Sequence, residues 1–197
     1  MSEASVRVPE ISELHDGREV DCVTTVRNGI TYYRQRVETL EYNHQMLHDG
    51  RYFSGGYFNA AVLNNAVIEL LVQSSATVNT HMQFSGSCGG DSTIQLFEGA
   101  TFSNAGAAVT ISNHNRQSVK VGDGMVTHTP TLLTDGATVN GIMFVPGGQK
   151  AQSGGGAGGF VGEFILQFAT TYLVRMTNLS GQTKPMSLMV AGYQPTL

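Results

Sequence analysis

From Gly55 onward, short runs of β-forming residues alternate with turn residues at intervals of about 8 to 12 residues, and this spacing constrains the fold most. The turns hold Gly89-Gly90-Asp91 and Asp135-Gly136, where glycine tolerates a positive φ. We therefore predict an all-β fold, a jelly-roll-like antiparallel β-sandwich. The roughly nine expected strands are residues 66–73, 77–84, 93–98, 108–112, 126–134, 138–145, 160–168, 172–179 and 186–193.

Charge is concentrated before this region. Nine of the fifteen Asp and Glu residues, and six of the eleven Lys and Arg residues, lie at or before Arg51. The segment has no long apolar stripe at helical spacing, although Val37, Leu40 and Leu47 suit a short helix and Asn28-Gly29 suits a hairpin turn. We expect residues 1–50 to form an extended N-terminal arm that becomes ordered on a partner, and residues 51–197 to form the β-sandwich domain.

The overall charge excludes several classes of protein. The chain carries a formal net charge of -4 and no run of Lys or Arg, so we expect no nucleic-acid partner. Its apolar runs are shorter than the roughly 20 residues of a membrane helix, and no charged-then-apolar leader opens the sequence. We expect a soluble protein without a signal peptide and without a membrane partner.

Two cysteines and a glycine-rich stretch raise the question of catalysis. Gly86-Ser87-Cys88-Gly89-Gly90 has the outline of a nucleophile elbow, with Asp123 and His128 following in acid-then-base order. The residues after it have the pattern of a strand rather than a helix, which favours a turn with a small buried cysteine. Cys22 stands far from Cys88, so no disulfide scaffold is specified. Lys150 precedes Ala151, which departs from a phosphate-binding loop and favours a long surface loop over residues 146–162.

Histidines provide the other candidate ligands. His44 and His48 are four residues apart, the spacing of a zinc-binding pair on one helix face, but Gln45 stands where that motif carries its catalytic Glu. His81 and His128 lie on expected strands and could meet on one sheet face, although half-buried sheet histidines are the ordinary alternative. We predict no catalytic residue, no bound metal and no cofactor.

An aromatic group sits where the arm meets the domain. It consists of Tyr52, Phe53, Tyr57 and Phe58. Such a group either forms a platform for sugars or anchors the first strand of a core. Carboxylates in residues 52–197 are scattered among separate expected elements, which disfavours the paired acids of a glycosidase.

Several segments resemble small virion proteins of tailed bacteriophages. The main one is residues 94–106, Ile-Gln-Leu-Phe-Glu-Gly-Ala-Thr-Phe-Ser-Asn-Ala-Gly. Residues 48–53, 113–118, 146–148 and 171–178 are similar to other parts of the same pattern, which extends from about residue 48 to residue 193. The resemblance implies a capsid decoration (cement) protein with a β-sandwich body, made in the host cytoplasm and located on the capsid surface of the virion.

The resemblance also implies partners. We expect the chain to bind the major capsid protein lattice and to form a homo-oligomer, a trimer because capsid proteins of this kind often occupy local threefold positions. The alternatives are a glycan-binding module of a phage tail or fibre, and an enzyme that uses Cys88 or the carboxylates. Large side chains and arginines dominate interfaces. The expected interface residues in the arm are Tyr32, Tyr33, Arg34, Arg36, Leu40, Tyr42 and Met46.

Overall fold

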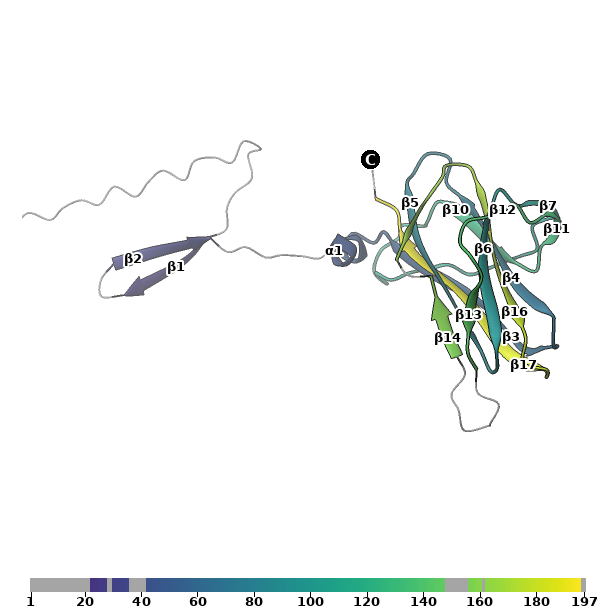
Figure 1. Cartoon of the computed structure of the whole chain (residues 1–197). Helices are drawn as coiled ribbons and strands as arrows, with labels where there is room; N and C mark the ends of the chain where they lie inside the picture. Colours follow the sequence, from purple (N-terminus) through teal and green to yellow (C-terminus); the bar gives the residue numbers. More distant parts are fainter. Residues whose placement is uncertain (1–21, 28–29, 36–41, 148–155, 161, 196–197) are drawn as a thin grey trace, which may run out of the picture. The chain divides into compact units, whose positions relative to one another are not determined.

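The computed structural model describes residues 22–27, 30–35, 42–147, 156–160 and 162–195 (Figure 1). The chain divides into two compact units, Met1–Leu40 and Glu41–Leu197. In the first unit, β1 (Cys22–Arg27) pairs antiparallel with β2 (Ile30–Gln35). These two strands flank Asn28-Gly29, the position in the sequence that suits a hairpin turn.

The second unit, which we call the body, is an antiparallel β-sandwich that begins with one short helix. Its elements are α1 (Tyr42–His48), β3 (Tyr52–Val62), β4 (Val67–Ser74), β5 (Thr80–Cys88), β6 (Ser92–Glu98), β7 (Thr101–Asn104), β8 (Ala107–Ala108), β9 (Ser112–Asn113), β10 (Gly124–His128), β11 (Thr131–Thr134), β12 (Ala137–Thr138), β13 (Met143–Val145), β14 (Gly156–Gly159), β15 (Phe164–Leu166), β16 (Thr171–Asn178) and β17 (Lys184–Tyr193).

Two sheets form the layers of the body. Sheet I has the order β12-β6-β16-β4-β10-β8, with β13 also paired to β6. Sheet II has the order β14-β5-β17-β3-β9, with β15 also paired to β5. The predicted all-β antiparallel sandwich is confirmed, and the jelly-roll-like connectivity stays a prediction. No helix in the described ranges is long and apolar enough to cross a membrane.

The main core lies between the two sheets. Leu70 of β4 and Val174 of β16 pair across sheet I and belong to one buried cluster with Leu188 of β17 in sheet II. Side chains alternate between the two faces of a strand, so every second residue of β17 points into this core and the residues between point outward. The regular pattern of residues 186–193 reflects this one-sided burial.

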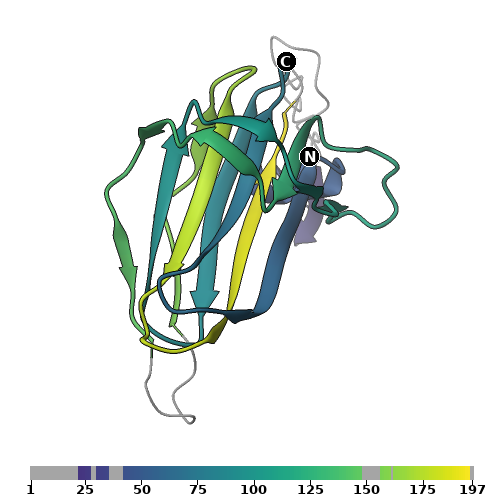
Figure 2. The ribbon, with the colours of Figure 1, turned by 90° about the vertical axis from the view of Figure 1, so that its right-hand side faces the viewer.

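Sheet I is buried on its second face as well. Leu71, Leu173 and Phe97 pair across β4, β16 and β6 and form a second buried cluster with Ala100. A two-stranded ribbon of β7 and β11 provides Phe102 and Leu132 to this cluster, and Figure 2 views the body from this side. Burial on both faces explains why β4 is nearly continuously apolar.

The boundary of the body differs from the prediction. The body begins at Glu41 rather than after residue 50, because α1 packs onto β3 and β17. Met46 is only 4% exposed in this packing. Met46 and the contact of Tyr42 with Tyr193 fix α1 to the sandwich, and two such contacts leave no long apolar stripe in the sequence.

Several predicted strands are shorter or divided. The expected strand 108–112 is replaced by β8 in sheet I and β9 in sheet II, and strand 138–145 is divided into β12 and β13. Strand 126–134 breaks after β10 because Thr129 adopts a φ of 56° and Pro130 lacks an amide hydrogen. Strand 160–168 contracts to β15, Phe164–Leu166.

Two glycine-containing strands were not predicted. β3 includes Gly55 and Gly56, and β14 is Gly156–Gly159 within the stretch expected to be a surface loop. They form because β17 and β5 provide backbone partners. Residues 148–155 and 161 of that stretch lie outside the described residues.

Candidate interaction surface

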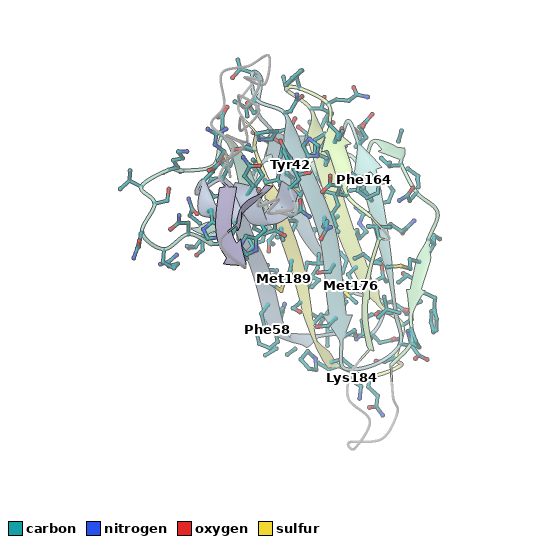
Figure 3. All side chains as sticks on the ribbon, turned by 90° about the vertical axis from the view of Figure 1, so that its left-hand side faces the viewer. Tyr42, Phe58, Phe164, Met176, Lys184 and Met189 are labelled. Atoms are coloured by element: carbon teal, nitrogen blue, oxygen red, sulfur yellow. The ribbon has the colours of Figure 1, made fainter. Side chains whose placement is uncertain are left out.

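The outer face of sheet II is exposed and carries no charged side chain over most of its length. The register places Phe58, Ser187 and Ser87 side by side, followed by Gly56, Met189 and Ser85, and then by Ser54, Ala191 and Gln83. We call these nine residues the open face. Phe58 is 63% exposed and Met189 is 49% exposed, and both are labelled in Figure 3.

The local sequence explains why this face is flat and uncharged. A Cβ atom on Gly56 would lie 2.7 Å from the Leu188 carbonyl oxygen and 3.0 Å from Met189 Cγ, so Met189 lies across the glycine. Serine, alanine and glycine fill most of the other positions. Interface cores are depleted of charged residues and enriched in Phe and Met, so Phe58 and Met189 have the character of contact residues, whereas the serines and alanine around them do not.

The outer face of sheet I has the opposite character because the β7–β11 ribbon covers it. Arg175 of β16 fixes the turn after this ribbon: its Nη1 and Nη2 donate to Asp135 Oδ2 and Oδ1 at 2.6 and 2.7 Å. Its Nε donates to Glu69 Oε1 at 2.6 Å, and the guanidinium carbon lies 5.4 Å from the centre of the Phe97 ring. The hydrogen bonds from Arg175 lower the pKa of Asp135 below its usual range, against the opposing effect of burial.

An aromatic cluster borders the open face. Tyr193, Tyr52 and His81 are cross-strand neighbours, and the Tyr193 ring stacks on His81 with centroids 4.5 Å apart. The ring of Tyr42 of α1 contacts that of Tyr193 edge to face, with ring centroids 5.6 Å apart. The ring centroids of Tyr52 and His114 are 4.8 Å apart. This cluster attaches the helix to the end of sheet II.

Glu163 connects the members of this cluster. Its Oε1 accepts a hydrogen bond from Tyr193 Oη at 2.7 Å and lies 3.0 Å from His81 Nδ1. Burial raises the pKa of Glu163, but the hydrogen bonds from Tyr193 and His81 outweigh it, so the net pKa is lowered. Burial and the same hydrogen bond raise the pKa of Tyr193. The cluster is therefore set up to hold a carboxylate and a neutral phenol near neutral pH.

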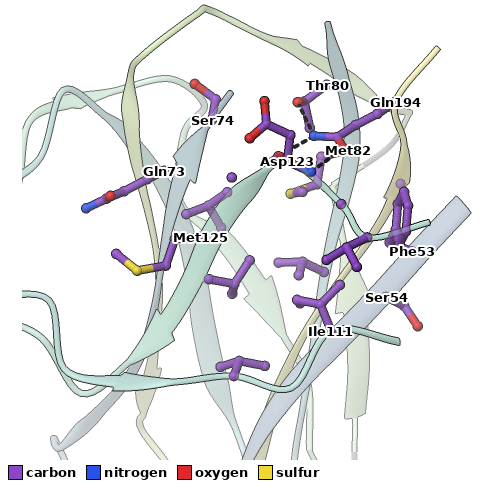
Figure 4. A pocket seen from close by; sticks show the side chains of 18 of the residues that line it. Phe53, Ser54, Gln73, Ser74, Thr80, Met82, Ile111, Asp123, Met125 and Gln194 are labelled. Carbon is purple, nitrogen blue, oxygen red and sulfur yellow. Dashed lines mark hydrogen bonds between the residues drawn. The ribbon is translucent and has the colours of Figure 1, made fainter. Parts of the chain in front are cut away.

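A cavity of about 270 Å³ lies between the sheets at one end of the sandwich (Figure 4). Phe53, Val72, Ile111 and other apolar residues line it. At its polar side Gln194 Nε2 donates to Thr80 Oγ1 at 3.0 Å, and Gln194 Oε1 accepts from the Asp123 amide at 2.7 Å. These groups satisfy one another, so the cavity offers mainly apolar contact.

The structure separates the candidate catalytic residues. Cys88 is 2% exposed, belongs to the main core and ends β5, and the chain continues through a turn into strand β6. Asp123 accepts a hydrogen bond from Ser75 at 2.5 Å, and His128 stacks on Tyr57 at 4.0 Å. A buried cysteine between two strands lacks the exposure of an elbow nucleophile.

The candidate histidine pairs have different outcomes. His81 lies on β5 of sheet II and His128 on β10 of sheet I, so they do not share a sheet face. His44 and His48 both lie on α1, with their Nε2 atoms 2.7 Å apart. In the part of the chain that the structure describes, no three His, Cys, Asp or Glu side chains are grouped to hold a metal ion.

The four junction aromatics lie on opposite faces of β3. Phe53 lines the cavity and Tyr57 packs against the main core, whereas Phe58 belongs to the open face and Tyr52 to the aromatic cluster. The four do not form one sugar platform, because successive side chains of a strand point to opposite sides. Their alternative role in anchoring the first strand of the body fits this arrangement.

The expected interface residues of the arm fall in three places. Tyr32, Tyr33 and Arg34 lie on β2, paired with Thr25, Thr24 and Val23. Arg36 and Leu40 lie outside the described residues. Tyr42 and Met46 belong to α1 of the body, where Tyr42 is 51% exposed and Met46 is buried. Met46 packs within its own chain and offers little surface to a partner, which corrects its expected role as an anchor.

The open face has one signal in the sequence: residues 52–62 and 185–193 contain no charged residue. The alternation of core and outer positions along residues 186–193 becomes visible only in the structure. Comparison of the chain with protein-family models, with curated proteins and with solved structures found no match.

Proposed function

We propose that this protein is a structural component of a bacteriophage virion that decorates and stabilises the capsid by binding the major capsid protein lattice. The open face is the observation that carries this proposal. It is exposed, uncharged and centred on Phe58 and Met189, whereas among the described residues the β7–β11 ribbon covers the outer face of sheet I. A surface of this kind is stabilised by contact with another protein.

The N-terminal unit supports attachment. A two-stranded hairpin is marginally stable by itself in water, so β1 and β2 gain most from packing against another surface. We propose that residues 1–40 contact neighbouring subunits or the lattice, with Tyr32, Tyr33, Arg34, Arg36 and Leu40 as the contact residues, together with Tyr42 of the body. We also propose that the protein forms a homotrimer. Several weak contacts that act together hold a protein on the lattice more strongly than one contact does.

Purified particles provide the test. The chain is expected in a fixed copy number on the outer surface of the head, visible by mass spectrometry and electron microscopy. Phe58→Glu and Met189→Glu should remain folded and lose occupancy, because each places a charge in the contact. Val119→Glu is the matched control, since Val119 is 94% exposed on the loop before β10. Absence of the chain from particles, or full occupancy by both open-face variants, would refute the proposal.

A second candidate function is a glycan-binding module of a phage tail or fibre. The aromatic cluster favours it, because Tyr42 is half exposed and lies beside Tyr193 and the hydrogen-bonding carboxylate of Glu163. Sugars bind to aromatic faces flanked by polar groups. Glycan-array binding that is lost in Tyr42→Ala and kept in Met189→Glu would favour this module over decoration.

A further inference from the structure

His44 and His48 occupy one face of α1, and their side chains converge. The two Nε2 atoms are 2.7 Å apart, and the ring centroids are 4.6 Å apart at an angle of 46°. Both residues are exposed to solvent. At this distance one neutral imidazole donates its Nε2–H to the Nε2 lone pair of the other. A metal ion held by both rings would replace that proton, with each Nε2 lone pair directed at the ion.

The helix that carries the pair is held firmly at its C-terminal end. Gly50 adopts a φ of 66°, and the amides of Gly50 and Arg51 donate to the carbonyls of Leu47 and Met46 at 3.0 and 2.8 Å. This is the Schellman arrangement that closes a helix.

Side chains from the loop after β9 bind the remaining carbonyls. Asn115 Nδ2 donates to the His48 carbonyl at 2.8 Å, and Lys120 Nζ donates to that of Asp49 at 2.8 Å. These bonds fix the backbone of the helix at His48, so the helical spacing of the two histidines is maintained.

We propose that His44 and His48 together bind one divalent transition-metal ion through their Nε2 atoms, which replaces the expectation of no bound metal drawn from the sequence. Metal–nitrogen bonds of about 2.0–2.1 Å place two adjacent imidazole nitrogens about 3 Å apart, so a small rotation of either ring accommodates the ion. Imidazole is a preferred ligand of copper, nickel and zinc, and Cu²⁺ forms the strongest complexes among these ions. The site therefore takes Cu²⁺ before Zn²⁺.

The chain provides only these two donors within the described residues, where no group of three metal-ligating side chains is found. The other coordination positions are left to water or to a donor from another molecule. Gln45 replaces the Glu of the zinc-protease motif, so the pair lacks that motif's general base. The site is a binding site on the helix and is independent of the proposed role in decoration.

Binding has a consequence for stability. The ion binds α1 only in its folded conformation, so it stabilises the helix and raises the thermal midpoint of the body by linkage.

The test uses the full-length chain without an affinity tag, titrated with Cu²⁺ and separately with Zn²⁺ by calorimetry at neutral pH. One equivalent of Cu²⁺ should bind, more tightly than Zn²⁺. His44→Gln and His48→Gln should each weaken Cu²⁺ binding by about tenfold or more, because even loss of a supporting group beside a ligand costs about 10-fold to 100-fold. His128 lies on β10 and not on α1, so the control variant His128→Gln should bind Cu²⁺ like the wild type.

Electron paramagnetic resonance of the Cu²⁺ complex gives a second readout. The wild type should show coupling to two imidazole nitrogens, and each single variant to one. Circular dichroism should confirm that the variants fold, which is expected because both side chains are exposed. Absence of Cu²⁺ binding by the wild type, or wild-type affinity together with coupling to two nitrogens in His44→Gln and His48→Gln, would overturn the proposal.

Discussion

Arg175 and Asp135 form a bidentate ion pair, although the residues are 40 positions apart in the chain. The Nη1 and Nη2 atoms of Arg175 each lie within 2.7 Å of a carboxylate oxygen of Asp135. The pair joins a central strand of sheet I to the turn between β11 and β12. Gly136, the next residue, has a φ of 87°, and a Cβ atom there would lie 2.3 Å from the Glu98 carbonyl oxygen. The turn and the ion pair together hold the β7–β11 ribbon over the second core.

Arg175→Met should destabilise the body by about 1–3 kcal/mol, the usual range for losing hydrogen bonds to charged groups. Glu69, with a side chain only 11% exposed, would lose its cationic partner. Urea unfolding should show a lower midpoint. Arg116→Met is the matched control, because the hydrogen bond from Arg116 to the Asn113 carbonyl is long, at 3.4 Å, and exposed. An unchanged midpoint in Arg175→Met would show that the ribbon is held by apolar packing alone.

The stability contributed by Asp135 should disappear in acid. Its pKa is lowered in the folded state by Arg175, so the stabilisation is present above the unfolded pKa of about 3.9 and is lost as the pH falls through the folded pKa. Asp135→Asn should therefore be less stable than the wild type at neutral pH, and the gap should close below about pH 4. Unfolding free energies measured from neutral to acidic pH would test this, and a constant gap would contradict it.

Tyr172 should show the corresponding behaviour in alkali. Burial and its 2.7 Å hydrogen bond to Glu98 raise the pKa of Tyr172 to about 12. The stabilisation of the folded state by the neutral Tyr172 phenol is fully present below the unfolded pKa of about 10, and it is lost as the pH rises toward 12. The wild type should lose more stability than Tyr172→Phe over this interval. Equal losses would mean that the phenol ionises normally in the folded protein.

The strands that could be predicted from sequence are those whose burial leaves a local pattern. Residues 67–72 are apolar apart from Glu69 because β4 is buried on both faces, and Ser187 separates Met186 from Leu188 because β17 is buried on one face. The ribbon that covers β4 could not be predicted, because it depends on a contact between Arg175 and Asp135 that no local pattern records. Glycine has low strand propensity, so β14 was missed although β5 provides its hydrogen-bond partners.

The candidate surface was harder to predict than the strands. The lack of charge in residues 52–62 is visible in the sequence, but which sheet face stays uncovered is decided by the position of the ribbon. Met46 illustrates the same limit within α1, because its burial depends on β3 and β17, which follow it in the chain. The pairing of His44 with His48 was visible from spacing alone, since residues four apart share a helix face.

Two adjacent residues of β17 provide a test of which face is buried. Leu188 is fully buried in the main core, and Met189 is 49% exposed on the open face. Leu188→Ala should cost about 2–5 kcal/mol because it leaves a cavity between the sheets. Met189→Ala should change stability by about 0.5 kcal/mol or less. Urea unfolding of both variants measures the difference, and similar losses would place Met189 in a folded contact within the chain.

Two N-terminal truncations should separate the arm from the body. Removal of residues 1–40 takes away the hairpin unit and leaves α1, so the body should keep its thermal midpoint. Removal of residues 1–50 also takes away Met46 and the contact between Tyr42 and Tyr193, and should cost about 2–5 kcal/mol, as for other buried large side chains. Thermal and urea unfolding of the two proteins would show this difference.

The protein that lacks only residues 1–40 should also lose binding to particles while remaining folded, since the proposed attachment residues of the arm precede Glu41. Wild-type occupancy by that protein would assign attachment to the open face alone, and a loss of folding on removal of residues 1–40 would show that the body depends on the arm.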